Sequence, residues 1–437
     1  MHSVRTADGH TDRTLWAALA PPAPPTSSLE QSVDVDVAIV GAGFMGLSTA
    51  LHLAEAGVST AVLEAERIGF GASGRNTGFV VPSLRASLGI EALREKLGVY
   101  GDRLWALVGS SAGIVFDLAA RHRLDCAAER TGWVSVAHTE AAMADLRTLA
   151  GAWADAGRSV ELLDAAGTKE RLGIRGYHGA LLDPAGGQIN PLAFVRGLAR
   201  VALDKGARVF TQSPARRIER TGERWTVHTD RGRVVAPRLL LATNAMGGSL
   251  VPRLATSIVP VVAYQVATQP LGATDLDAIL KGRPCVADTR RHTFAVRLSE
   301  DNRLVTGGLV FGDASAIRRA RSIFIPRLAQ RFPSLPPLTS EFTWRGMIAT
   351  TPDFLPRLYT LGPDFFAAIG CNGRGVAMTT TLGRELASFL SGARAEADLP
   401  LPVQPPEPRT AHSLVRFGPA MWLLWSNLCD RLETGMA

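Results

Sequence analysis

The feature that most constrains the fold of this chain is a strand–turn–helix–strand pattern that begins at residue 34. The run 34–40, DVDVAIV, alternates and then becomes wholly apolar, which is typical of a strand that enters a core. A glycine motif, GAGFMG, follows at once, and the apolar spacing over 44–56 predicts a helix. Residues 60–63 then predict a second short strand. The pattern indicates the first βαβ unit of an α/β domain of the Rossmann type.

Each glycine of this motif has a separate physical task. Gly41 permits the tight turn after the strand, Gly43 lets a pyrophosphate approach the backbone, and Gly46 lets the helix pack close to the strand. The helix N-terminus favours the anion, because its free N–H groups and its dipole point toward it. Glu64 ends the second strand, where its carboxylate is placed to accept hydrogen bonds from ribose hydroxyls. Together these residues predict a dinucleotide site.

Two further glycine-rich loops favour FAD over a nicotinamide dinucleotide. The first, GASGRNTG at 71–78, follows closely, and a flavin needs such a small, polar loop to pass its ribityl chain and ring. The second, GCNGRGV at 370–376, lies between a predicted strand at 365–369 and a predicted helix over 379–390. Its N–H groups and the helix N-terminus suit the electron-rich pyrimidine end of a flavin, whose charge grows on reduction. The predicted cofactor is therefore FAD.

The segment 35–80 and the motif GCNGRGVAM at 370–378 resemble the FAD-dependent D-amino-acid oxidase superfamily, in particular its gamma-glutamylputrescine oxidase-like and glycine- or sarcosine-oxidase-like amine oxidases. The resemblance extends to Trp16, to the sequence RLS at 297–299 and to an aromatic C-terminal tail. It implies an α/β fold: a Rossmann-type FAD-binding domain with a second, α+β substrate domain whose antiparallel sheet covers the flavin. It also implies an enzyme that oxidises the C–N bond of an amine or amino acid by hydride transfer to flavin, giving an imine that water hydrolyses.

The resemblance also implies which residues contact the cofactor. The first glycine motif holds the pyrophosphate, Glu64 the ribose, the 71–78 loop the ribityl and ring portion, and the 370–378 segment the pyrimidine end. The full implied set is Gly41, Gly43, Phe44, Met45, Gly46, Glu64, Ala65, Gly71, Ser73, Arg75, Asn76, Thr77, Gly78, Ala215, Ala242, Thr243, Asn372, Gly373, Arg374, Gly375, Val376 and Met378. Sarcosine oxidase-like relatives attach FAD to a cysteine where this chain has Gly346, so non-covalent FAD is predicted.

Four side chains are candidates for contact with the substrate: Tyr264, His292, Arg297 and Trp344. Arg297 is suited to clamp a carboxylate through two hydrogen bonds, so the predicted substrate carries an anionic group. Ala295 stands where the relatives often have a tyrosine, which leaves room for a group of different shape. Each candidate has a plainer alternative: a sheet-edge arginine, a core tyrosine, a surface histidine and a core tryptophan.

The element pattern and the resemblance divide the chain into two domains and two flanking segments. The FAD-binding domain is assigned to 34–85, 187–257 and 343–393, and the substrate domain to 86–186 and 258–342. Residues 1–33 are expected to form a loose leader, because four prolines lie between positions 21 and 25. Residues 394–437 form a predicted proline-rich linker and aromatic tail, which is a candidate for contact with a membrane surface or a partner subunit.

The composition disfavours several classes of protein. The formal charge is +7, but only four of the 47 basic residues are lysine, which a GC-rich coding bias explains. No long basic run supports a nucleic-acid partner, and none is expected. The four cysteines lie far apart without a Cys/His cluster, so neither a disulfide framework nor a metal site is predicted. No transmembrane stretch and no signal peptide is recognisable, so a cytoplasmic location is predicted.

Three alternative functions stay open on the sequence alone. A flavin monooxygenase or an NAD(P)H-linked reductase needs a nicotinamide site, and no second strand–GxGxxG–helix pattern exists in the chain. A tRNA-modifying flavoenzyme on the same fold is suggested by the positive charge, and an electron-relay subunit by the fold itself. The electron acceptor, which is oxygen or another oxidant, is not specified by the sequence.

Overall fold

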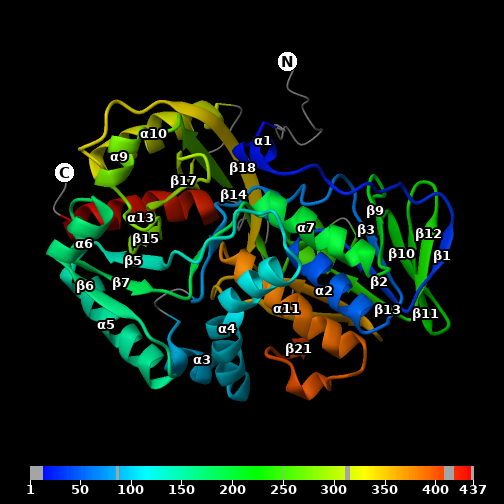
Figure 1. Cartoon of the computed structure of the whole chain (residues 1–437). Helices are drawn as coiled ribbons and strands as arrows, with labels where there is room; N and C mark the ends of the chain where they lie inside the picture. The colour runs from blue at the N-terminus through cyan, green and yellow to red at the C-terminus, as the bar shows by residue number, and fades with distance from the viewer. Residues whose placement is uncertain (1–12, 85–87, 249, 311–314, 408–417, 435–437) are drawn as a thin grey trace.

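Two large β-sheets organise the chain (Figure 1). The computed structural model describes residues 13–84, 88–248, 250–310, 315–407 and 418–434. The seven-stranded sheet lies on the right of Figure 1 with its helices, and the eight-stranded sheet extends to the left. The two sheets alternate along the sequence, so the chain passes between them several times.

The seven-stranded sheet has the order β21-β19-β20-β13-β2-β3-β9, and its strands from β20 to β9 are parallel. All residues of β2 and β3 are buried, as expected of parallel strands that are covered on both faces. Helix α2 (Phe44–Glu55) packs against α7 (Pro191–Asp204) and α11 (Gly375–Leu390). The strands are β2 (Val37–Val40), β3 (Thr60–Leu63), β9 (Arg208–Phe210), β13 (Arg238–Leu241), β19 (Arg357–Gly362), β20 (Phe365–Ile369) and β21 (Val403–Gln404). The predicted Rossmann-type α/β class is confirmed.

The eight-stranded sheet has the order β18-β14-β17-β16-β15-β5-β7-β6, and its neighbouring strands are antiparallel except for β15 and β5. Its strands are β5 (Trp133–Ala137), β6 (Glu161–Asp164), β7 (Gly179–Asp183), β14 (Val259–Thr268), β15 (Cys285–Asp288), β16 (Ala295–Leu298), β17 (Leu304–Leu309) and β18 (Ser340–Thr350). Helix α10 (Ala316–Arg331) packs on one face against β14, β17 and β18. The opposite face of β14 and β18 is turned toward the first sheet.

The remaining elements border the two sheets. A four-stranded sheet has the order β1-β12-β11-β10, and β4 pairs with β8. These strands are β1 (Ser32–Asp34), β4 (Phe79–Val80), β8 (Gly187–Gln188), β10 (Arg217–Thr221), β11 (Arg224–His228) and β12 (Arg233–Ala236). The other helices are α3 (Ile90–Leu97), α4 (Val99–Arg121), α5 (Glu140–Asp155), α6 (Ala165–Leu172), α8 (Pro252–Ala255) and α9 (Ala273–Ala278), with 3-10 turns at Ala72–Gly74, Asn244–Met246 and Glu396–Asp398.

Helix α4 is, by length and composition alone, sufficient to cross a membrane. However, 56% of the most apolar 18-residue stretch of this helix is buried inside the protein. The helix packs against α11 and α3, and its buried residues belong to the largest hydrophobic cluster. A core helix satisfies the same criterion of length and hydropathy, and these contacts are those of a core helix.

Three elements of the structure lie within or across the predicted segments. Part of the expected leader forms α1 (Leu15–Leu19), which begins where the Thr14 hydroxyl accepts a hydrogen bond from Ala17 N at 3.0 Å. The prolines follow this helix and so do not prevent it. Strand β18 runs through the predicted boundary at 343 within the eight-stranded sheet, and β21 of the proline-rich segment joins the edge of the seven-stranded sheet. The division into two domains otherwise stays a prediction.

The C-terminal tail contains α13 (Gly418–Thr434), and two of its acidic side chains contact the connection between β15 and β16. Asp430 accepts hydrogen bonds from the backbone N–H groups of Arg291, at 3.2 Å, and His292, at 3.0 Å. Glu433 forms an ion pair with Arg291 at 2.7 Å. The tail therefore packs on the chain's own substrate-domain side, and a membrane or subunit contact stays a prediction. Among the side chains of this helix that the structure describes, Met421, Trp422, Trp425 and Leu432 are apolar and exposed.

Candidate cofactor-binding site

A cavity of about 430 Å³ lies between the two sheets. It begins at the carboxyl ends of β2, β3, β13 and β20, and β14 and β18 of the other sheet provide its opposite wall. Doubly wound sheets bind their ligands in this position. Most residues that were predicted to contact the cofactor line the cavity. The exceptions are Gly46, Gly78, Asn372 and Arg374.

The first glycine motif forms one end of the cavity. Gly41 has a φ of +109°, and a Cβ at this position would lie 2.8 Å from the carbonyl oxygen of Ala242. A Cβ on Gly46 would lie only 2.0 Å from the carbonyl oxygen of Gly41. Gly46 therefore does not touch the cavity itself but lets α2 pack onto β2, which brings the N-terminus of α2 to the cavity.

Glu64 lies beside this motif with its carboxylate at the cavity wall. One carboxylate oxygen accepts a hydrogen bond from Ala42 N at 2.9 Å, and the other accepts one from Glu66 N at 3.0 Å. Burial raises the pKa of this carboxyl group, and these two hydrogen bonds oppose the shift. A carboxylate keeps further acceptor capacity after two such bonds, so Glu64 is able to accept from ribose hydroxyls.

The 71–78 loop forms the next part of the wall. The Ser73 hydroxyl accepts a hydrogen bond from Phe44 N at 3.0 Å, which ties the loop to the N-terminus of α2. Asn76 donates from its side chain to the carbonyls of Ala72, at 3.0 Å, and Ser73, at 2.9 Å, and it accepts from Gly78 N at 2.7 Å. The Asn76 side chain thus satisfies three backbone groups of its own loop, which favours one loop conformation.

Three buried side chains from distant parts of the sequence hold the outer surface of this loop. Trp16 donates to the Asn76 carbonyl at 2.7 Å, and Trp344 donates to the Arg75 carbonyl at 2.9 Å. Arg297 donates to the carbonyls of Thr77 and Gly78, both at 3.2 Å, and to that of Ile189 at 2.7 Å. The rings of Trp16 and Trp344 meet edge to face at 5.9 Å, and the Arg297 guanidinium lies 5.0 Å from the Trp16 ring centre.

These contacts point to roles for Arg297 and Trp344 other than the predicted contact with substrate. Arg297 is only 1% exposed and does not line the cavity, because its guanidinium is turned toward main-chain carbonyls. Burial lowers its pKa. Trp344 is also 1% exposed, and it packs behind the loop in place of forming a substrate wall. Both residues therefore support the 71–78 loop, which disfavours a carboxylate clamp at Arg297.

The second glycine loop borders the cavity mainly through its backbone. Gly373 and Gly375 line the cavity just before α11, whereas Asn372 and Arg374 do not. The Asn372 side chain accepts a hydrogen bond from Thr351 N at 2.8 Å and so fixes the loop from behind. Arg374 donates to the Ser83 carbonyl at 3.0 Å. These hydrogen bonds hold the loop from behind, and the predicted contact of Asn372 and Arg374 with the flavin stays a prediction.

Tyr264 and His292 also lie away from the cavity, and strand alternation explains the position of Tyr264. In β14, Ala263 and Gln265 line the cavity, whereas Tyr264 points to the opposite face and packs against Phe324 of α10. His292 is buried beneath α13. Sequence reasoning missed Gln265, whose side-chain oxygen is buried and has no hydrogen-bond partner among the residues that the structure describes. Successive side chains of a strand point to opposite faces, so the position of Gln265 next to Tyr264 could have indicated that only one of the two faces the cavity.

The residues around the cavity fit FAD. The N-terminus of α2 favours the pyrophosphate, and Glu64 offers acceptors to a ribose. Ile348, Met378 and Leu382 provide apolar contacts for a planar ring system, and the backbone before α11 offers N–H groups to its polar edge. One end of the cavity thus favours an anionic group, and the other end is apolar. These two ends match the pyrophosphate and the planar ring system of FAD.

Treatment of the protein with acid is expected to release all its flavin as free FAD. Gly346 lines the cavity and offers no thiol, and Cys371, which also lines it, is a poor nucleophile because burial raises its pKa. The measurement is the absorbance near the flavin maximum in the supernatant and the pellet after precipitation. Yellow colour that stays in the pellet would contradict non-covalent binding, and a Cys371→Ala variant would then test whether this thiol is the point of attachment.

Comparison with known proteins agrees with this site. Residues 36–389 match the model of the family described as FAD dependent oxidoreductase. The chain is 34% identical to gamma-glutamylputrescine oxidoreductase of Escherichia coli over 97% of this chain and 99% of that protein, and 31% identical to a probable oxidoreductase of Haemophilus influenzae over 84% and 85%. The fold is similar to that of glycine oxidase from Geobacillus kaustophilus, with a TM-score of 0.67 at 21% identity over 82% of this chain and 95% of that one.

The match to the family model covers most of the chain, and the cavity contains the features that FAD requires. The resemblance inferred from the two glycine loops is therefore confirmed. The chain belongs to the FAD-dependent oxidoreductase family that contains the D-amino-acid oxidase-like amine and amino acid oxidases.

Proposed function

We propose that the protein oxidises the C–N bond of an amine or amino acid, with FAD as hydride acceptor, and yields an imine that water hydrolyses. The observation that carries the proposal is the cavity, in which a site that fits FAD is covered by the eight-stranded sheet. The relative named gamma-glutamylputrescine oxidoreductase supports an amine substrate. Bound FAD supplies the redox chemistry, and the chain provides binding, orientation and a sheltered space.

The wall of β14 and β18 indicates how the chain contributes. Ala263, Gly346 and Met347 make this wall small and apolar, which leaves room for a substrate and disfavours water. Gln265 adds a polar group that is 8% exposed. We propose that its amide accepts a hydrogen bond from the substrate nitrogen and so orients the carbon that loses hydride. The chain thereby needs no strong acid or base if the amine binds unprotonated.

The prediction of an anionic group on the substrate rested on Arg297. Because Arg297 donates to the 71–78 loop, it no longer supports that prediction. We therefore keep the substrate class as amine or amino acid. Oxygen or another oxidant is the proposed electron acceptor, and a cytoplasmic location is proposed as before. We do not propose a tRNA partner. The cavity and the family match both fit an enzyme that acts on a small molecule.

The direct test of the proposed function is anaerobic flavin reduction. The holoprotein is mixed with a panel of primary and secondary amines and amino acids, and separately with NADH and NADPH, while flavin absorbance is followed. At least one amine or amino acid is expected to bleach the flavin, whereas neither nicotinamide nucleotide is expected to do so within seconds. Rapid bleaching by a nucleotide, with none by the amine panel, would instead support the monooxygenase or reductase alternative.

A Gln265→Leu variant is expected to raise the KM for the best amine by about threefold to tenfold, because one hydrogen bond contributes about 0.5–1.5 kcal/mol. FAD content is expected to stay unchanged. The matched control is Tyr264→Phe, the neighbouring residue on the opposite face, which is expected to leave KM within about twofold. Equal KM values in wild type and Gln265→Leu would remove Gln265 from the substrate site.

A further inference from the structure

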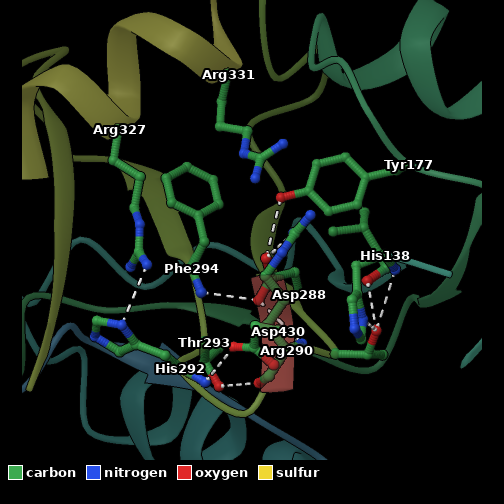
Figure 2. Close-up of polar contacts among 12 residues, drawn as sticks. His138, Tyr177, Asp288, Arg290, His292, Thr293, Phe294, Arg327, Arg331 and Asp430 are labelled. Carbon is green, nitrogen blue, oxygen red and sulfur yellow. Dashed lines mark hydrogen bonds and ion pairs between the residues drawn. The ribbon is translucent and has the colours of Figure 1, made fainter. Parts of the chain in front are cut away.

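Figure 2 shows a cluster of arginines beside α10. Helix α10 packs on the face of the eight-stranded sheet opposite the cofactor cavity. Arg290 belongs to the connection between β15 and β16, and Arg327 and Arg331 extend from α10. At their centre is Asp288, whose side chain is fully buried. It accepts hydrogen bonds from Arg290 at 2.5 Å and from the Tyr177 hydroxyl at 3.2 Å. These side chains come from three separate parts of the chain and meet beneath α13.

Positive charge exceeds negative charge in this cluster. The guanidinium groups of Arg290 and Arg331 both lie against the ring of Tyr177, with centroid distances of 5.3 and 5.1 Å. Asp288 neutralises one of the three arginines. Burial lowers the pKa of Arg327, and the nearby Arg331 and Arg290 add to that effect while Asp288 opposes it. A buried excess of positive charge is unfavourable unless an anion compensates for it.

The acidic side chains of α13 do not supply this anion. Asp430 accepts from the N–H groups of Arg291 and His292, and Glu433 pairs with Arg291 and His138. These contacts hold α13 in place. Asp288 is therefore the acidic residue that pairs with an arginine of the cluster, and it pairs with Arg290.

Two of the arginines also carry buried donors without an acceptor. Arg331 is 8% exposed, and it donates from Nη1 to the Arg175 carbonyl at 3.3 Å, but its Nε has no partner among the described residues. Arg327 donates from Nη2 to Nδ1 of His292 at 3.2 Å. Its buried Nη1 has no hydrogen-bond partner among the residues that the structure describes. Buried N–H groups are nearly always hydrogen-bonded, so these two donors indicate a missing acceptor.

We propose that Arg290, Arg327 and Arg331 form a binding site for a small oxyanion, a phosphate or a carboxylate, that is separate from the cofactor cavity. An oxyanion supplies several acceptor atoms at once and balances the excess charge. The planar, forked guanidinium groups suit such groups well. Bound there, the anion links α10 to the β15–β16 connection on which α13 docks, and so stabilises the substrate-domain side of the protein.

The test is isothermal titration calorimetry on the FAD-loaded protein, at constant ionic strength in a buffer without oxyanions. Inorganic phosphate, sulfate and acetate are titrated separately, which distinguishes a phosphate-type from a carboxylate-type ligand. The variants are Arg327→Met and Arg331→Met. The matched control is Arg318→Met, an exposed arginine on the same helix. We expect saturable binding of at least one anion to wild type and to the control, and at least tenfold weaker binding to the two cluster variants.

The melting temperature separates binding from a purely structural role. The ligand is expected to raise the melting temperature of wild type by about 1–3 °C at tenfold its dissociation constant. It is expected to leave the cluster variants unchanged, relative to chloride. Arg331→Lys keeps the charge and serves if Arg331→Met does not fold. Absence of saturable binding to wild type, or equal binding to wild type and the cluster variants, would overturn the proposal.

Discussion

Replacement of Arg297 with methionine is expected to remove FAD from the protein, with loss of at least about 90% of the bound cofactor on dialysis. Arg297 donates to four main-chain carbonyls, two of them in the 71–78 loop, and it is only 1% exposed. A hydrogen bond from a charged donor contributes about 1.5–3 kcal/mol, and each buried carbonyl left without a donor adds a penalty. The loop that faces the flavin therefore loses its support. The measurement is the FAD-to-protein ratio after dialysis, together with the melting temperature.

The control for this prediction is Arg94→Met, which removes an exposed arginine with ion pairs to Glu91 and Asp102. Exposed pairs contribute little, so this variant is expected to keep its FAD and its melting temperature. If Arg297→Met kept full FAD content and lost only affinity for the substrate, the carboxylate clamp predicted from the sequence would be correct, and the structural role assigned here would be wrong.

Replacement of Gly46 with alanine is expected to have a comparably large effect on FAD binding. The added Cβ would lie 2.0 Å from the Gly41 carbonyl oxygen, which is backbone and cannot rotate away. Helix α2 must then move off β2, which shifts the N-terminus that faces the pyrophosphate. Overpacking of this kind costs about 1–3 kcal/mol, and misplacement of the anion site adds to the loss, so we expect FAD to bind at least about hundredfold more weakly. A fluorescence titration with FAD measures this change.

Gly113→Ala is the matched control, because Gly113 also lies within a helix but a Cβ there meets no atom within 4 Å. Alanine favours a helix over glycine by about 1 kcal/mol, so this variant is expected to be as stable as wild type or more so. Equal FAD affinity in Gly46→Ala and Gly113→Ala would show that close packing of α2 on β2 is not required for the site.

The parts of the site that could be predicted from sequence are those in which neighbouring residues cooperate. The turn at Gly41, the helix that follows and Glu64 at the end of β3 all depend on local spacing, and the structure places them as expected. The 71–78 loop likewise satisfies its own backbone through Asn76. Local physics determines such segments, because turn geometry and capping involve residues only a few positions apart.

The parts that could not be predicted depend on contacts between distant residues. Nothing in the local sequence indicates that Trp16, Trp344 and Arg297 all donate to the 71–78 loop, since each contact joins segments far apart in the chain. Strand β14 illustrates a second reason. Its second half, from Tyr264 to Thr268, is buried on both faces, so the apolar residues there do not reveal that Gln265 faces the cavity and Tyr264 faces α10.

The most direct measurement of the central claim is a single-turnover product analysis under anaerobic conditions. Holoprotein is mixed with an excess of the best amine from the panel, and the flavin reduced is compared with the carbonyl compound and the free amine or ammonia released. Oxidation of a C–N bond followed by hydrolysis of the imine predicts one equivalent of each product per flavin reduced. Flavin reduction without any carbonyl product, or no reduction by any amine or amino acid while another donor reduces the flavin, would contradict the account.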